Sequence, residues 1–305
     1  MPGFLTHYLA GQAALIQLPD EINAIVKGER QQIFTLGAQG PDIFFYYAPG
    51  FARARIRGIG TNIHDSGFAH FFMYMARINK HITNAEQKEV LFAYLAGFLV
   101  HYCLDVNAHP FVNAHSQEEN KTAIQRSAAH RHLETVIDVL MLARLRGEKP
   151  ADYNQADLIN APALHKRIAS AAFATAASKV YGCNMRPQDV YHAMGHMTAL
   201  TRLLHSNGGR RKRFAEFLEE KTVQAHIISS MVHMQEVADG KDHLNLSRLH
   251  WNESTASFPE LFDTATEDAA NMIQILHKYI YKKTTRAELA KIIGNFSLST
   301  GDNLA

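Results

Sequence analysis

The sequence has too few cysteines, prolines and glycines for several classes of protein. Its two cysteines, Cys103 and Cys183, cannot build a disulfide framework, and neither belongs to a Cys-x-x-Cys pair of the kind that binds metal or carries redox chemistry. Only 18 of the 305 residues are glycine and 9 are proline, whereas 10% are aromatic, so a collagen-like repeat and a disordered chain are excluded. With 47% hydrophobic and 20% charged residues, the composition is that of a globular protein with a sizeable core.

The chain also lacks a strong net charge and a long hydrophobic run. A formal net charge of +2 is too small to indicate a nucleic-acid partner. The longest apolar run, residues 90–100, is shorter than the roughly 18 residues that a membrane span needs. The first seven residues carry no basic stretch typical of a signal peptide. We therefore expect a cytoplasmic protein, and the sequence carries no signal for an oligomeric state.

Helical periodicity runs through the whole sequence, and no segment alternates as a strand would. A long buried helix is predicted from Asn84 to residue 109, because Pro110 disfavours helical geometry in the residue before it. Loops rich in Gly, Asn, Asp or Ser are predicted at residues 37–62, 147–160, 206–211 and 240–257. The other predicted helices cover residues 6–17, 19–27, 66–81, 121–146, 161–181, 187–206, 211–239, 259–283 and 285–293.

These elements predict an all-α, multi-helix fold without a clear linker, repeat or low-complexity segment. We interpret residues 1–305 as one large domain. Residues 1–146 would form its functional core, and residues 147–305 a helical extension that can belong to the same core.

Histidine is the abundant residue that calls for an explanation, with 18 copies against 31 lysines and arginines. On the long predicted helix, His101, Asp105 and His109 follow one another at intervals of four residues and so form one stripe. Adjacent members of the stripe, about 6 Å apart along the axis, can share a metal ion, whereas His101 and His109 are about 12 Å apart. If all three bind metal, more than one ion is needed, with Asp105 as the bridge. Asp105 follows an apolar run, and a buried carboxylate needs such a partner.

The next predicted helix repeats the pattern with His130 and Glu134, and Asp138 lies one turn further on. Pairs of this kind also occur as surface ion pairs or as satisfied polar groups in a core. If His130 and Glu134 face the stripe of residues 101–109, however, the two helices together present a mixed set of imidazoles and carboxylates. Such a set suits zinc or another first-row divalent ion better than Mg²⁺ or Ca²⁺, which prefer oxygen ligands alone.

These motifs resemble the paired motif of the zinc-dependent phospholipase C family. Residues 100–110 carry His-x-x-x-Asp-x-x-x-His-Pro, and residues 129–138 carry His-x-x-x-Glu. The upstream segments 36–46, which contains Gly40-Pro41-Asp42, and 2–7 also resemble the shorter bacterial members. The resemblance covers about residues 1–140. It implies the all-α fold shared with P1-type nucleases, in which three zinc ions lie at the bottom of a cleft and hydrolyse phosphate diesters.

The same resemblance implies a set of zinc ligands, with two or three Zn²⁺ ions in all. Carried over by position, one ion is held by Asp42, His64, His101 and Asp105, a second by His109, His130 and Glu134, and a third by His7 with the bridging Asp105. In secreted members an N-terminal Trp completes the third site, whereas this chain begins Met1-Pro2-Gly3. His70 is an alternative to His64, and His115 is an alternative to His109.

The implied reaction is hydrolysis of a phosphate diester by a water whose pKa the zinc ions lower toward about 7. Asp42 would orient or deprotonate that water, although it can also be read as a turn residue. A phospholipid is the first expected substrate, with transient contact to a membrane surface, and nucleic acid is the less favoured second. Residues 44–47, all aromatic, either border the cleft or belong to the core.

Two other functions also fit the sequence. In an HD-type metal-dependent phosphohydrolase, His64 and Asp65 would be the metal-binding dyad, but the stripes at residues 101–109 and 130–134 would have no role. A non-catalytic helical protein could instead keep zinc for stability alone. The pair His192 and His196 and the pair His226 and His233 have no carboxylate in matching register and are interpreted as structural or surface residues.

Overall fold

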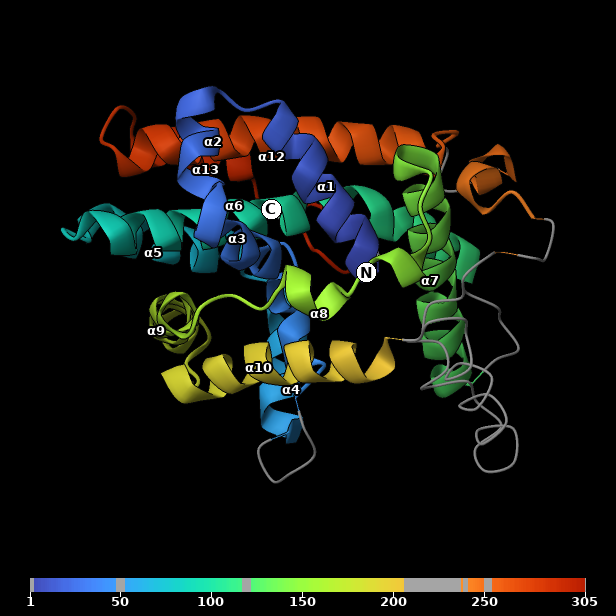
Figure 1. Ribbon diagram of the computed structural model, residues 1–305, viewed down its shortest axis with the longest axis horizontal. Helices are drawn as coiled ribbons and strands as arrows, with labels where there is room; N and C mark the ends of the chain where they lie inside the picture. The colour runs from blue at the N-terminus through green and yellow to red at the C-terminus, as the bar shows by residue number, and fades with distance from the viewer. Residues whose placement is uncertain are drawn as a thin grey trace.

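A computed structural model describes residues 3–47, 53–116, 122–205, 237, 241–249 and 254–304. Over these residues the chain is helical and contains no strand, apart from an isolated bridge between Phe296 and Asn303. The all-α prediction is therefore confirmed. In Figure 1 the helices lie in three tiers around α6 (Ala85–Ser116), with α12 (Phe258–Ile280) above it and α9 (Ala163–Tyr181) and α10 (Pro187–Leu204) below it.

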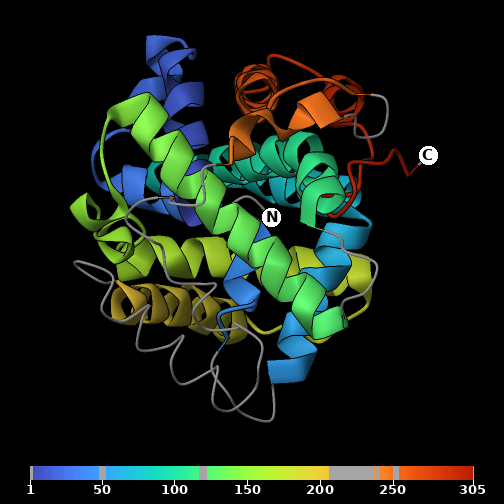
Figure 2. The ribbon, with the colours of Figure 1, turned by 90° about the vertical axis from the view of Figure 1, so that its right-hand side faces the viewer.

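The remaining elements surround these four helices. The α-helices are α1 (Phe4–Ile16), α2 (Asp20–Val26), α3 (Gln31–Gly37), α4 (Arg53–Asp65), α5 (Phe68–His81), α7 (Ala123–Arg146), α8 (Gln155–Leu158) and α13 (Arg286–Ile293). The short 3-10 helices are η1 (Gly28–Arg30), η2 (Gly40–Phe44), η3 (Pro150–Asp152) and η5 (His243–Leu249). Figure 2 shows α7 crossing one side of the molecule, where it packs against α1 and α6.

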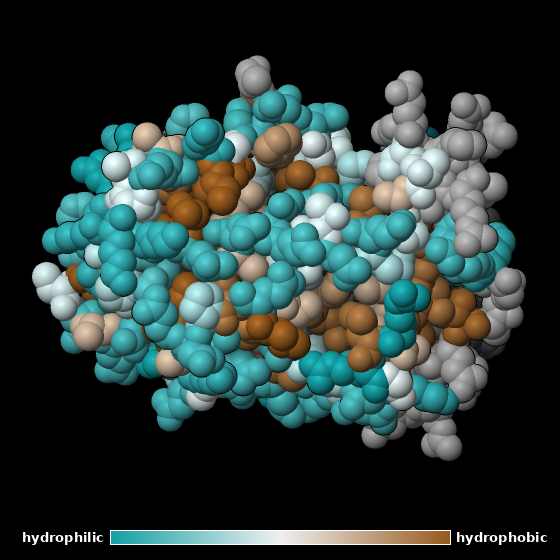
Figure 3. All heavy atoms as spheres, turned by 90° about the horizontal axis from the view of Figure 1, so that it is seen from above, coloured by the Kyte–Doolittle hydropathy of each residue, from teal (hydrophilic) through white to brown (hydrophobic). Residues whose placement is uncertain are grey.

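Helix α6 forms the centre of the core. It is long and apolar enough to cross a membrane, but 89% of its most apolar window is buried inside the protein. Its partners are α12, α3, α9, α1, α5 and α7, so it is covered along most of its length. The buried hydrophobic side chains form one cluster that includes residues from Phe4 to Leu298. Residues of α12 belong to this cluster, so the C-terminal part of the chain shares a core with the N-terminal part. On the face in Figure 3, hydrophilic side chains separate several hydrophobic areas.

Glycines bring α3 unusually close to α6. A Cβ atom on Gly97 would overlap the Phe34 carbonyl oxygen, and one on Gly37 would overlap the Tyr94 carbonyl oxygen. Just after α3, Gly40 has a φ of +49°, and a Cβ there would overlap the His101 ring. Because these positions carry no side chain, η2 lies directly over His101 and brings Asp42 to it.

The prediction of a loop over residues 37–62 is wrong, because this segment contains η2 and most of α4. Helix α4 has few apolar residues, which hid it in the sequence. Its buried positions Ile56, Ile59 and Ile63 nevertheless follow the spacing of a helix that buries one face.

The predicted end of the long helix before Pro110 is also wrong, since α6 continues to Ser116. Proline removes one hydrogen bond, to the Val106 carbonyl, but a helix held by neighbours on several sides tolerates that loss. The C-terminal tail packs against this turn: a Cβ on Gly301 would lie 2.6 Å from the Val106 oxygen and 2.8 Å from Cγ of Pro110.

The predicted loops 147–160 and 240–257 contain the short helices η3, α8 and η5, and α12 begins one residue past the second loop. The predicted helix over residues 211–239, with His226 and His233, lies outside the described residues apart from residue 237. The remaining predicted helices agree with the structure to within about three residues at their ends.

Candidate metal centre

Buried histidines and carboxylates meet where α1, η2, α4, α6 and α7 converge. Within the described part of the chain, three groups place one possible ligand atom from each member within 4.8 Å of the others. The groups are His7 with His101 and Asp105, Asp42 with His64 and His101, and His109 with His130 and Glu134. The structure thus brings together all eight residues that the sequence analysis singled out, from five separate elements.

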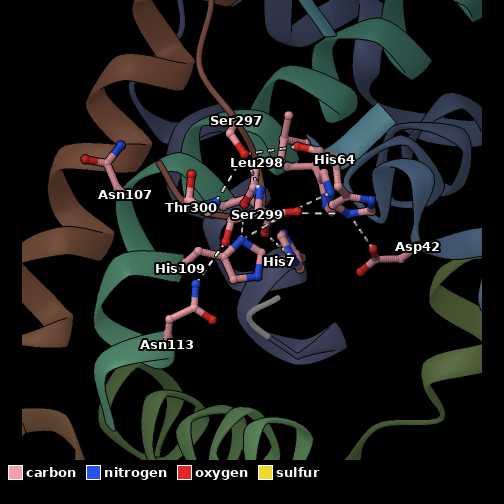
Figure 4. Close-up of polar contacts among 12 residues, drawn as sticks. His7, Asp42, His64, Asn107, His109, Asn113, Ser297, Leu298, Ser299 and Thr300 are labelled. Carbon is pink, nitrogen blue, oxygen red and sulfur yellow. Dashed lines mark hydrogen bonds and ion pairs between the residues drawn. The ribbon is translucent and has the colours of Figure 1, made fainter. Parts of the chain in front are cut away.

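The second of these groups lies where η2 and α4 cover α6. His64 Nε2 is 3.1 Å from Oδ1 of Asp42 and 3.7 Å from Oδ2 of Asp105. His101 Nε2 is 3.1 Å from the same Asp105 oxygen. All four side chains are buried. Figure 4 shows Asp42 and His64 turned toward each other.

Asp105 also faces α1 through its other oxygen. His7 Nε2 is 3.4 Å from Asp105 Oδ1, and the His7 ring stacks on His101 with 4.4 Å between centroids. The two oxygens of Asp105 therefore point at different imidazoles, which is the arrangement expected of a carboxylate that bridges two ions.

The third group joins α6 to α7. His130 Nε2 lies 2.7 Å from Oε1 of Glu134, and the His109 and His130 rings are 5.8 Å apart between centroids. His109 Nδ1 is 3.9 Å from Asp105 Oδ2, so this group adjoins the other two. The stripe on α6 thus serves all three groups.

Asp138 on α7 fixes the position of α1, and hence of His7. Its carboxylate accepts hydrogen bonds from the backbone N–H of Leu5 (3.0 Å), the backbone N–H of Thr6 (2.7 Å) and the Thr6 hydroxyl (2.5 Å). The two backbone N–H groups belong to the first turn of α1, where a helix supplies no partner for them. A Cβ on Gly3 would overlap this carboxylate, so the approach requires glycine. Sequence reasoning placed Asp138 in the stripe of α7 but did not find this role, because its partner is distant in the chain.

Two histidines are oriented by groups outside the three clusters. His64 Nδ1 lies 2.8 Å from the Gly60 carbonyl oxygen, one turn earlier in α4. His130 Nδ1 lies 3.3 Å from the Ser116 hydroxyl. A carbonyl that accepts the proton on Nδ1 leaves the lone pair on Nε2, which is how metal-binding histidines are commonly held.

The electrostatics of the site favour ionised carboxylates and a neutral His101. Burial raises the pKa of the Asp105 carboxyl, but the adjoining imidazoles outweigh that effect and hold the pKa well below its usual range. Burial likewise opposes ionisation of Glu134, while nearby positive charge, including His130, lowers its pKa to about 2. Burial lowers the pKa of His101. Burial also opposes the charged form of His64, but the adjacent Asp42 carboxylate outweighs it and raises the pKa of His64.

The chemistry of these donors fits a divalent metal. Both oxygens of Asp105, both ring nitrogens of His7 and His101, Oδ1 of Asp42 and Nε2 of His64 are buried and make no hydrogen bond. Leaving one such buried polar group without a hydrogen bond costs about 1–3 kcal/mol, and a charged one more. The carboxylate oxygens and one ring nitrogen of each histidine carry lone pairs that converge here, so bound cations account for these donor atoms together. Imidazole nitrogen and carboxylate oxygen together suit zinc.

Neither alternative ligand, His70 or His115, belongs to one of the three groups in the described part of the protein. His70 lines a surface pocket together with Arg286 and Lys291. The His115 ring packs edge-on against Phe111, with 4.7 Å between centroids. Asp65 is exposed, accepts a hydrogen bond from the Ser299 hydroxyl (2.6 Å) and belongs to none of the three groups, so the described residues give the HD-type reading no support.

The aromatic residues 44–47 divide between the core and the site. Phe44 is fully buried and meets Phe173 edge-on, 5.2 Å between centroids. Phe45 lies beside the His64 ring at 5.5 Å and so borders the candidate centre. Tyr47 contacts His196 of α10 at 5.0 Å.

The comparisons with known proteins agree with this geometry. A family model described as zinc-dependent phospholipase C matches residues 6–181, more than half of the chain, and every predicted ligand falls inside that range. No curated protein and no solved structure matches the chain. The matched range ends with α9, so α10, α12 and α13 lie beyond it.

Proposed function

Because the chain belongs to the zinc-dependent phospholipase C family, we propose that it hydrolyses phosphate diesters with zinc, and that a phospholipid is its substrate. The observation that carries the proposal is Asp105, a fully buried carboxylate whose oxygens lie within 3.1–3.9 Å of ring nitrogens from four histidines. An ion pair that only stabilises the fold would need one imidazole next to the Asp105 carboxylate. A metal centre shared by several ligands explains why four imidazoles surround it.

We assign the ligands in three sets. One zinc would be held by Asp42, His64, His101 and Asp105, a second by His109, His130 and Glu134, and a third by His7 with Asp105 as the bridge. When bound, zinc supplies a Lewis acid for the phosphoryl oxygens and lowers the pKa of water. The oriented Nε2 atoms of His64 and His130 support this assignment, because they face the carboxylates of their own groups.

Asp42 is the proposed general base. Its Oδ1 is buried and makes no hydrogen bond, and η2 holds it against α6 at the edge of the histidine cluster. In the reaction, the water oxygen bonds to phosphorus and Asp42 takes a proton from that water. The bond from phosphorus to the alcohol oxygen of glycerol breaks, that oxygen takes a proton from solvent water, and Asp42 returns its proton to solvent. The products are diacylglycerol and a phosphate monoester.

Aromatic and cationic side chains beside Asp42 suit a lipid phosphate. Phe45 lies next to His64, and the Arg57 guanidinium sits over the Phe45 ring, 5.9 Å from its centroid. An apolar ring with a cation above it can meet both the acyl-glycerol part and the phosphate of a phospholipid. This arrangement also suits transient contact with a membrane surface. The preference for a lipid over nucleic acid as the substrate rests on the family's description.

The test measures hydrolysis of phosphatidylcholine vesicles and of single-stranded DNA by the zinc-loaded protein. We expect release of phosphocholine from the vesicles and little cleavage of DNA. Asp42→Asn keeps an oxygen for the metal but cannot take a proton, so turnover should fall by about 10²- to 10⁴-fold with zinc content largely kept. A zinc-loaded protein that hydrolyses neither diester would instead indicate a non-catalytic zinc protein, and full activity of Asp42→Asn would exclude Asp42 as the base.

A further inference from the structure

The last described residues form a folded tail, 295–304, that we call the strap. Its two ends pair with each other: the Leu304 N–H donates to the Asn295 carbonyl (2.7 Å), and the Ser297 N–H donates to the Asp302 carbonyl (2.9 Å). Figure 4 shows the middle of the strap, residues 297–300, lying between His64 and His109. These residues are more than a hundred positions beyond the matched range, yet they reach the candidate metal centre.

The strap binds the backbone of His64. The Leu298 N–H donates to the His64 carbonyl oxygen at 2.8 Å, and the Ser299 N–H reaches the same oxygen at 3.3 Å. The Ser297 hydroxyl donates to it as well, at 3.4 Å. His64 lies in the last turn of α4, where carbonyls have no partner within the helix. The strap therefore supplies the partners that hold this end of α4 in place.

Leu298 of the strap also binds the His109 side chain, which belongs to the third metal group. The Leu298 carbonyl oxygen accepts a hydrogen bond from Nδ1 of His109. One turn further along α6, the Asn113 side-chain amide donates to the Ser299 carbonyl at 2.9 Å. Leu298 thus contacts His64 through its N–H and His109 through its carbonyl, and so connects two of the three groups.

Several contacts hold Leu298 in the position from which it reaches both His64 and His109. Its side chain is fully buried in the hydrophobic cluster. The Ser297 hydroxyl accepts hydrogen bonds from the N–H groups of Ser299 (3.2 Å) and Thr300 (3.3 Å), which closes the turn around Leu298. The Tyr102 hydroxyl of α6 accepts from the Phe296 N–H at 3.3 Å and donates to the Ile293 carbonyl at 2.8 Å.

We propose that the strap is a positioning element of the metal centre, in which the Leu298 backbone holds His64 and turns Nε2 of His109 toward His130 and Glu134. The inference rests on the proposed function, because it assumes that these histidines bind zinc. Its physical reason is that an acceptor on Nδ1 selects the tautomer with the proton there and leaves the Nε2 lone pair for the metal.

The variant test compares Ser297→Ala with Thr300→Ala. The first removes the hydroxyl that closes the turn and reaches His64. The second is a matched control, since the Thr300 hydroxyl accepts only from the Asp302 N–H within the strap among the hydrogen bonds described. Zinc release is measured against a competing chromophoric chelator, together with the visible spectrum of the cobalt-substituted protein and the Tm of the metal-free protein. Loss of a group that orients a ligand typically weakens metal binding about 10- to 100-fold.

We expect Ser297→Ala to release at least one zinc at about tenfold lower chelator concentration, with an altered cobalt spectrum, while Thr300→Ala matches the wild type. If Ser297→Ala lowers only the Tm of the metal-free protein and keeps zinc as tightly as the control, the strap merely stabilises the fold and the proposal is wrong.

A second measurement needs no variant and covers the case in which Ser297→Ala does not fold. Long-range ¹⁵N–¹H correlation spectra of the zinc-loaded wild type report which ring nitrogen of each histidine carries the proton. We expect Nδ1–H tautomers for His64 and His109, and a zinc-bound Nδ1 of His109 would overturn the inference. A wild-type protein that binds no zinc would refute the proposed function itself, whereas the two outcomes above refute only the role of the strap.

Discussion

At the scale of single residues, Asp105 decides whether the site is a metal centre. It lies on α6 among imidazoles from α1, α4 and α6, and both its oxygens are buried without a hydrogen bond. Its ionised state is stabilised by those neighbours rather than by water. A site built around one buried carboxylate should depend on its charge more than on its volume.

Removing the negative charge of Asp105 without changing the size of its side chain tests whether the site depends on that charge. Asp105→Asn keeps the volume of the side chain but removes a bridging oxygen anion, so we expect loss of at least one zinc per chain by elemental analysis. Because bound zinc stabilises the folded state by about 4 kcal/mol when its free concentration is a thousandfold above Kd, the Tm of the zinc-loaded variant should fall toward that of the metal-free protein. Asp65→Asn, at an exposed acid beside His64, is the control and should retain all its zinc. Equal zinc in both variants would remove Asp105 from the ligand set.

Gly40 tests the close approach of η2 to His101. Gly40→Ala places a Cβ at a φ of +49° where it overlaps the His101 ring. We expect a loss of about 1–3 kcal/mol in the free energy of unfolding, measured by urea denaturation of the metal-free protein, and weaker zinc binding. Gly58→Ala, on the exposed face of α4 with open space around it, should instead gain about 0.5–1 kcal/mol. A neutral Gly40→Ala would show that η2 has room to move away from α6.

At the scale of elements, α4 carries His64 and is held from two sides. The strap binds its C-terminal end, and near its N-terminal end Arg55 forms a 3.0 Å ion pair with Asp189 of α10. Asp189 is buried and also accepts from the Arg186 guanidinium at 2.8 Å. Helix α10 lies beyond the matched range, so part of what positions α4 comes from outside the family motif.

The Asp189 contact predicts a pH dependence of stability. Burial raises the pKa of Asp189, but hydrogen bonds from Arg186 and Arg55 outweigh it and lower the pKa from 3.8 to about 2. A carboxyl whose pKa is depressed by folding stabilises the protein above its unfolded pKa and loses that effect as the pH falls toward its folded pKa. The difference in Tm between the wild type and Asp189→Asn should therefore be full above about pH 4 and shrink between pH 4 and pH 2. A difference that is constant over this range would show that the charge of Asp189 does not matter.

The elements also show what the sequence could and could not predict. The stripe His101, Asp105 and His109 was readable because an α-helix fixes its spacing. Helix α4 was missed because its arginines and glycines mask three buried isoleucines, and the continuation of α6 past Pro110 depends on packing that no local pattern encodes. The placement of Asp42 and His64 against α6 came only from the family resemblance, since their contacts are tertiary.

At the scale of the whole molecule, the site is assembled from both ends of the chain. His7 comes from the first helix, whose start is capped by Asp138 of α7, while the strap comes from the last described residues. Neither contact could be predicted from sequence, because each joins residues more than 130 positions apart. Since α12 packs along α6, which carries three of the ligands, we propose that residues 147–305 belong to the same domain as the ligands.

The most direct test of the account is a count of metal ions in the purified, tag-free protein. Elemental analysis should find two or three zinc ions per chain, lost together with thermal stability when a strong chelator is added, because metal binding in such sites is coupled to folding. A protein that holds no zinc after equilibration with the metal, and whose Tm does not respond to the chelator, would contradict the account and return these buried histidines to a structural role.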